Sequence, residues 1–156
     1  MNILRYLAKR LREFLNPEWP AEPDIRLQAI NVTRGTELAS CLEVAGTGSK
    51  RNKGLLGRSS LLPGEGLWIV PCESVHTFFM RFPIDLIYLD RQKRIRKVRS
   101  SVGAWRLSAC LSAHSILELP SGTIRDTGTE RGDRVEFNPQ ASNPVSEGDH
   151  SAVILS

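Results

Sequence analysis

The 156-residue sequence lacks any run of about 18 apolar residues, the length that a membrane-spanning helix requires. The first fifteen residues are also not expected to be a secretory signal peptide. Arg5, Lys9, Arg10 and Arg12 interrupt the N-terminal apolar stretch, and no small-residue cleavage site follows it. These absences predict a protein of the cytoplasm, either free there or peripheral to the inner membrane.

Cysteine is also scarce. Cys41, Cys72 and Cys110 are too few, and odd in number, for a disulfide framework, which favours a reducing compartment. The motifs "CESVH" and "CLSAH" share one spacing and offer a Cys2His2 set of zinc-type ligands: Cys72, His76, Cys110 and His114. On an extended strand, residues four apart lie about 13 Å from each other and cannot share one ion. We therefore expect no cofactor and keep zinc only as the alternative to two buried thiols and two incidental histidines.

Charge excludes little, because the formal net charge is only +4. Basic residues gather in 5–12, 50–58 and 91–99, but no known nucleic-acid-binding module accompanies them. Nucleic acid is therefore not the expected partner. The expected partner is an unknown small molecule or protein.

Residues 1–16 place apolar side chains on one helical stripe and basic side chains largely off it, which predicts a basic amphipathic helix. Such a helix binds an anionic membrane surface through residues 1–15, or docks on its own domain or on a second copy in a homodimer. The proline-rich residues 17–24 predict an extended linker that separates this helix from the rest of the chain.

Residues 25–138 contain eight short strand-like segments separated by glycine, proline or charged turns. This pattern predicts a mainly β fold, a single compact antiparallel β-sandwich or barrel domain. One short internal helix or structured loop is expected in 50–62, where strand character is poor. Residues 139–156 form a polar tail.

The stretch "HTFFMRFPIDLIYL" puts charged residues into the most apolar part of the sequence. Alternation along a strand from His76 to Phe82 would point Phe78, Met80 and Phe82 to the same face as His76. We expect a bend at Pro83, after which the alternation of side chains between the two faces starts anew.

In the restarted alternation, Asp85 lies on the same face as Ile87 and Leu89, so it is expected to be buried. A buried carboxylate must be paired, hydrogen-bonded or protonated. Its expected partners are Arg81, Arg58 or backbone amides at the bend.

Three residues are candidates for catalysis. His76 with Asp85 would form an acid–base pair, and Glu118 in "SILELP" either faces solvent, the favoured reading, or lines a pocket. No serine sits in a nucleophile elbow. The favoured function is therefore a non-catalytic ligand-binding or accessory module, with a membrane surface as a partner of its first helix. The alternative is a hydrolase-type enzyme that uses His76 with Asp85 or Glu118.

Three blocks follow one another in the order of a known pattern: "KGLLGRSSLLPGEGLWIV", "HTFFMRFPIDLIYLDRQKRIRKV" and "ILELPSGTIRDTGTERGDRV". Over about residues 50–136 the sequence resembles the domain of unknown function family DUF192, which is mainly bacterial and archaeal. The resemblance implies a compact, mainly β single domain and no particular activity. The family's polar pattern falls on Arg58, Glu65, Arg81, Asp85, Glu118, Gly122 and Asp133.

This sequence departs from the family pattern in a region that could rim a pocket. Phe79 stands where tryptophan is usual, Arg81 stands where lysine is usual, and "SSVGAWRLSA" replaces a proline-rich loop. In that loop Trp105 could contact a ligand by stacking and Arg106 by charge. The candidate ligand-binding residues are Arg58, Arg81, Asp85, Trp105 and Arg106.

Overall fold

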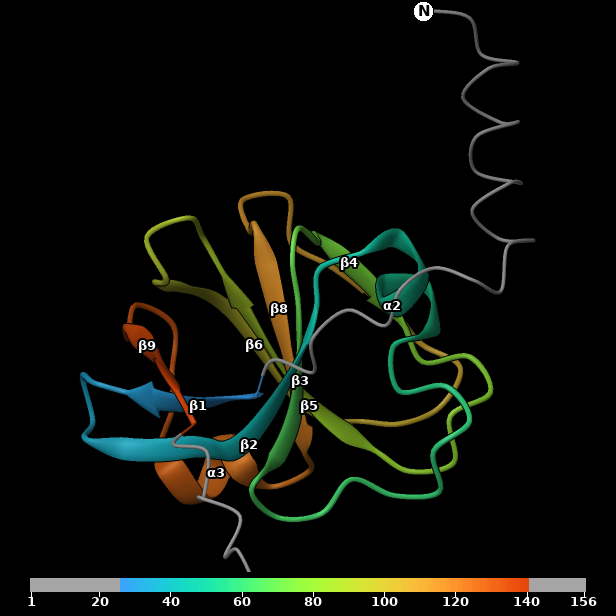
Figure 1. Cartoon of the computed structure of the whole chain (residues 1–156), viewed down its shortest axis with the longest axis horizontal. Helices are drawn as coiled ribbons and strands as arrows, with labels where there is room; N and C mark the ends of the chain where they lie inside the picture. The colour runs from blue at the N-terminus through green and yellow to red at the C-terminus, as the bar shows by residue number, and fades with distance from the viewer. Residues whose placement is uncertain (1–25, 141–156) are drawn as a thin grey trace, which may run out of the picture.

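The computed structural model describes residues 26–140, which form nine strands and two short helices (Figure 1). In chain order the elements are β1 (Arg26–Asn31), β2 (Thr36–Ala45), α2 (Gly48–Lys53), β3 (Glu65–Ile69), β4 (Ser74–His76), β5 (Ile84–Leu89), β6 (Ile95–Val102), β7 (Leu107–Ala109), β8 (Ser115–Pro120), α3 (Thr123–Thr127) and β9 (Val135–Pro139). The fold is therefore mainly β, as the strand-like segments predicted.

Seven strands form one curled sheet in the order β6-β5-β8-β3-β2-β1-β9, and β4 pairs with β7 in a separate two-stranded sheet. The prediction of a purely antiparallel fold is wrong at one place, because β2 and β3 run parallel. Parallel strands require a crossover connection of about a dozen residues or more. The segment that holds α2 provides this connection.

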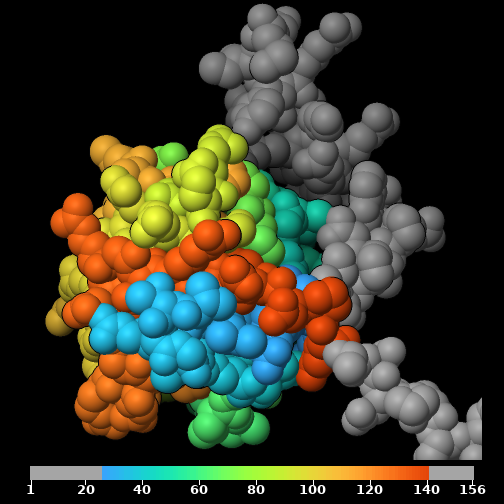
Figure 2. Space-filling view, turned by 90° about the vertical axis from the view of Figure 1, so that its left-hand side faces the viewer, coloured from blue at the N-terminus to red at the C-terminus, as the bar shows by residue number. Residues whose placement is uncertain are grey.

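The sheet curls until its two edges approach each other. Arg94, just before β6, bridges Arg134, just before β9, and the backbone nitrogen of Ile95 donates to the carbonyl of Asp133 at 2.8 Å. Figure 2 shows the β9 segment lying between β1 and the segment that leads into β6. The result is a half-barrel, which satisfies part of the backbone at both edges.

Two hydrophobic cores lie on opposite faces of the sheet. In β5, Ile84, Leu86 and Tyr88 belong to one core, while Ile87 and Leu89 belong to the other, so the alternation predicted after Pro83 is confirmed. The core that contains Ile87 fills the inside of the curl. Here Trp68 of β3 stacks on Phe137 of β9, with ring centroids 4.2 Å apart. We call the opposite core, which contains Leu86, the outer core.

The predicted strand from His76 to Phe82 is wrong beyond its first residue, because β4 ends at His76. Thr77 is buried and is held by the loop 103–106. Its hydroxyl donates to the carbonyl of Gly103 at 2.7 Å and accepts from the backbone nitrogen of Arg106 at 3.0 Å. Phe79 then adopts a left-handed backbone with φ of 63°. These bonds turn the chain away from the sheet, so the alternation does not continue to Phe82.

The two helices differ in how well the sequence predicts them. α2 overlaps the stretch 50–62 in which a short helix was expected, whereas α3 was not expected. The predicted helix of residues 1–16 and linker 17–24 lie outside the described residues, as does nearly all of the predicted tail. Within residues 26–140 no helix is long and apolar enough to cross a membrane.

Candidate ligand-binding site

Asp85 is completely buried at the start of β5 and accepts three backbone hydrogen bonds. Its Oδ1 accepts from the nitrogen of Ser101 at 2.8 Å, and its Oδ2 accepts from the nitrogens of Gly122 at 3.2 Å and Ile124 at 2.8 Å. The carboxylate therefore ties β5 to the end of β6 and to the first turn of α3.

This geometry corrects the partners expected for Asp85. Neither Arg81 nor Arg58 pairs with it, and the amides come from β6 and α3 instead of the bend at Pro83. Because both oxygens are occupied by backbone donors, Asp85 is a structural group. This arrangement does not favour the predicted acid–base pair of Asp85 with His76.

Asp133 is a second buried carboxylate of the same kind. It accepts from the side chains of Asn31 at 2.9 Å and Arg34 at 3.0 Å, and from the backbone nitrogen of Glu130 at 3.0 Å. Burial opposes ionisation, but these hydrogen bonds outweigh it and lower the pKa of Asp133. Asp133, which lies at a polar position of the DUF192 pattern, is therefore also held in a structural arrangement.

Glu118 is different, because it is buried without a partner. It lies on β8, in the middle of the sheet, in register with Leu86 of β5 and Leu67 of β3, both members of the outer core. Its side chain is 4% exposed, so the favoured reading that it faces solvent is wrong. Within residues 26–140 its Oε2 has no hydrogen-bond partner. Burial raises the pKa of Glu118 to about 7, an effect that the charge of Arg58 partly opposes.

A cavity of about 360 Å³ opens over Glu118 on this face of the sheet. Its lining includes Arg51, Lys53, Cys72, His76, Met80 and Glu118. The chain passes close to the carboxyl group at Gly54, where an added Cβ would lie 3.9 Å from Glu118 Oε2. A carboxyl group on the floor and cations from α2 thus line one cavity.

His76 lines this cavity together with Glu118, whereas Asp85 is not part of the lining. Cys72 also lines it, but burial raises the pKa of this thiol, and its Sγ lies 3.1 Å from the carbonyl oxygen of Ser74. The raised pKa disfavours the thiolate, which is the nucleophilic form of a cysteine. The cavity brings together one of the two predicted acid–base pairs, His76 with Glu118.

The four candidate zinc ligands are not arranged as a metal site within residues 26–140. No group of three or more His, Cys, Asp or Glu side chains within the described part of the chain is arranged to hold a metal ion. Instead, Cys110 has its Sγ 3.4 Å from the hydroxyl of Ser112, and the carbonyl of His114 accepts from the backbone nitrogen of Cys72.

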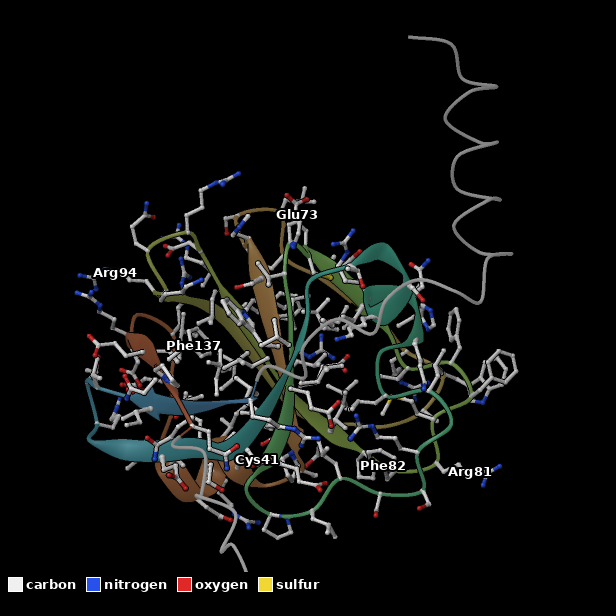
Figure 3. The ribbon with its side chains drawn as sticks, in the orientation of Figure 1. Cys41, Glu73, Arg81, Phe82, Arg94 and Phe137 are labelled. Carbon is white, nitrogen blue, oxygen red and sulfur yellow. The ribbon has the colours of Figure 1, made fainter. Side chains whose placement is uncertain are left out.

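The remaining predicted ligand contacts are spread over the surface. Arg58 donates to both carboxylate oxygens of Glu43 at 2.8 Å. Arg81 is exposed and projects away from the ribbon (Figure 3). Trp105 is 57% exposed, and Arg106 beside it donates to the carbonyl of Trp105 at 3.3 Å.

Of the six lining residues named above, Arg51, Lys53 and Met80 were not candidate site residues in the sequence. The two cations belong to the basic run 50–58, which was noted only as charge. Its glycine at position 54 is the signal that the backbone passes close to another group.

The chain folds as a small, mainly β half-barrel with a cavity over a buried carboxyl group. Residues 29–137 match the model of the DUF192 family, described as an uncharacterised ACR, and the chain belongs to this family. The resemblance seen in the sequence is thus confirmed.

Two archaeal relatives carry the name UPF0127 protein, which denotes the same uncharacterised family. The one from Thermococcus gammatolerans is 32% identical over 115 residues, which cover 70% of this chain and 74% of that protein. The one from Pyrococcus furiosus is 33% identical over 115 residues, which cover 70% of this chain and 97% of that protein.

Two solved structures share the fold. A putative transcription regulator from Sinorhizobium meliloti 1021 has a TM-score of 0.64 at 22% identity, over 75% of this chain and 98% of that one. A protein of unknown function from Novosphingobium aromaticivorans has a TM-score of 0.63 at 20% identity, over 76% of this chain and 89% of that one. At these identities the similarity concerns the fold alone.

Proposed function

We propose that this protein is a non-catalytic module that binds a small molecule in the cavity over Glu118. The observation that carries the proposal is the buried Oε2 of Glu118, which has no partner within residues 26–140. A polar group buried without a hydrogen bond costs about 1–3 kcal/mol. Since its neighbours in register are leucines, an apolar side chain would fill this position at lower free energy. A ligand that bonds to the carboxyl group accounts for its presence.

The lining gives the ligand's chemical class. Glu118, with a pKa of about 7, offers a hydrogen-bonding carboxyl group at the floor, while Arg51 and Lys53 bring positive charge from α2. A volume of about 360 Å³ suits a small molecule. The proposed ligand therefore carries a polar group that meets Glu118 and an anionic group that meets α2.

Thermal unfolding of the full chain with a panel of small carboxylates and phosphates tests this function. At least one of these anions should raise the melting temperature of the wild type, because a ligand that binds only the folded state stabilises it. The Glu118→Leu variant should fold and lose this response, whereas Glu130→Leu, an exposed control, should keep it. Equal responses of the wild type and Glu118→Leu to every compound would refute the proposal.

A hydrolase remains the second candidate because His76 and Glu118 line the same cavity. A carboxyl group with a pKa of about 7 suits general acid–base work near neutral pH. If His76→Ala and Glu118→Gln both remain folded and both abolish hydrolysis of nitrophenyl esters or phosphate esters, the result would favour the enzyme. Activity retained in either variant would exclude this pair.

Membrane association through residues 1–15 stays a proposal based on the sequence, and so does the cytoplasmic location. Co-sedimentation with anionic vesicles, comparing the full chain with a chain that begins at Asp24, tests the first of these. The full chain should sediment more strongly. Equal sedimentation of the two chains would refute an anchor in residues 1–15.

A further inference from the structure

Four apolar side chains and the imidazole of His76 form a continuous strip beside the cavity, contributed by β4, β7 and the loops that follow and precede them. Its members, in contact order, are Leu107, His76, Phe78, Trp105 and Phe79. Leu107 and His76 are register partners, and the ring centroids of His76 and Phe78 lie 5.0 Å apart. Trp105 lies 5.5 Å from Phe78 and 4.7 Å from Phe79 between centroids.

The strip is unusually exposed for its composition. Phe79 is 72% exposed, Trp105 57% and Leu107 73%. Phe79 and Trp105 also adopt left-handed backbones, with φ of 63° and 60°, which bulky residues rarely do. The hydrogen bonds of Thr77 to the loop 103–106 maintain this backbone. The fold thus holds two aromatic rings outward at a conformational cost, a feature that is concentrated at functional sites.

The segments around the strip carry charge of one sign. Residues 46–64, 74–84 and 99–112 contain no aspartate or glutamate, although the whole chain has 17 acidic residues. The basic residues in these segments are Lys50, Arg51, Lys53, Arg58, Arg81, Arg99 and Arg106. In Figure 3, Arg81 projects from this end of the molecule and Arg94 from the opposite end. The two segments that carry the strip, 74–84 and 99–112, therefore contribute the exposed cations Arg81, Arg99 and Arg106 and no carboxylate.

We propose that this strip inserts into the surface of an anionic lipid bilayer, with Arg81 and Arg106 contacting the lipid headgroups. Apolar side chains that enter the interface, next to basic residues that attract acidic lipid, are the two elements of peripheral membrane binding. This contact is separate from the predicted helix of residues 1–15. It also does not depend on the ligand proposed for the cavity.

The geometry favours lipid over single-stranded nucleic acid. Bases stack on aromatic faces that are open to solvent. Here the rings of His76 and Phe78 stack on each other, and Phe79 meets Trp105 at an interplanar angle of 63°. The strip also ends in an aliphatic residue, Leu107, which offers no stacking face. A bilayer requires only apolar surface and positive charge, and the strip provides both.

Co-sedimentation of the full chain with vesicles of phosphatidylcholine and phosphatidylglycerol tests the proposal. The double variant Phe79→Ser with Trp105→Ser should lower the partition coefficient at least about tenfold. The control Leu111→Ser, at an apolar residue that is 85% exposed outside the strip, should bind as the wild type does. Arg81→Glu should weaken binding about tenfold, since it removes one attractive charge and adds a repulsive one. Arg94→Glu, at the opposite end, should weaken binding less than Arg81→Glu.

A second measurement does not rely on the double variant's folding. Vesicles of brominated lipid should quench the tryptophan fluorescence of the full chain, because Trp105 enters the bilayer. Trp105→Phe should remove the part of this quenching that comes from Trp105. Unchanged quenching in Trp105→Phe, or wild-type vesicle binding by a folded double variant, overturns the proposal. So does a wild type that binds a labelled single-stranded oligonucleotide through the strip and binds no vesicle.

Discussion

Replacing Asp85 with asparagine tests the central structural assignment of this fold. The change keeps the shape of the side chain and removes its charge. The asparagine oxygen can still accept from Gly122 and Ile124 at the start of α3, but the amide group then faces the backbone N–H of Ser101, which loses its acceptor.

The magnitude follows from these three bonds. An orphaned buried donor costs about 1–3 kcal/mol, and each of the two remaining bonds weakens by about 1 kcal/mol when its acceptor becomes neutral. Asp85→Asn should therefore lower the free energy of unfolding by about 3–5 kcal/mol. For a domain of this size the melting temperature should fall by about 10–20 °C.

Urea and thermal unfolding followed by circular dichroism measure this loss. Asp126→Asn is the matched control, because its ion pair with Arg125 is exposed on both sides, and it should change stability by less than about 0.5 kcal/mol. A loss below about 1 kcal/mol in Asp85→Asn would refute the assignment of Asp85 as a structural group.

Three further predictions concern the cavity and the loop beside it. Glu118→Leu should raise the free energy of unfolding by about 1–3 kcal/mol at about pH 8, measured by urea unfolding, since it removes a buried, unpartnered carboxyl group; a loss of stability would contradict this. The pKa of Glu118 is raised in the folded state, so the folded protein binds the proton of Glu118 more tightly than the unfolded chain does. The resulting contribution to the free energy of unfolding is fully present below about pH 4.5. That contribution, about 3 kcal/mol, should be lost as the pH rises through about 7, and Glu118→Gln should flatten the profile of unfolding free energy against pH. Thr77→Val should destabilise by about 2–3 kcal/mol in thermal unfolding, because two hydroxyl bonds to the loop 103–106 are lost, while Thr77→Ser should retain most of the stability; equal losses in both variants would show that the hydroxyl does not hold the loop.

The sequence predicted those parts of the fold that depend on residues close together in the chain. Short apolar segments gave a mainly β domain, and the alternation after Pro83 assigned each residue of β5 to the correct face. The parallel pairing of β2 with β3 was missed, because it depends on which strands meet across a long connection. α3 was missed because it has only five residues and no side-chain cap of its own. Asp85 caps it from 37 and 39 residues away in the chain.

The candidate site was predicted less well, for the same physical reason. Alternation separated Glu118 from its neighbours Leu117 and Leu119, yet it does not reveal what covers each face of a central strand. The outer core and the chain around Gly54 bury Glu118, and both come from residues distant in sequence. Aromatic and charge content identified Trp105 and Arg106 as unusual, but their exposure depends on the bonds of Thr77.

The pairing of β1 with β9 joins the first and last strands of the described chain, with Leu27 in register with Pro139. During synthesis the half-barrel therefore remains incomplete until its last strand has left the ribosome. Until then the edge of β1 stays open to pairing with other chains. A truncation that removed only β9 would expose this edge and also take away Phe137, the ring that covers Trp68. The same pairing brings the ends of the domain together at one edge, so a circular permutation could join them without crossing the cavity.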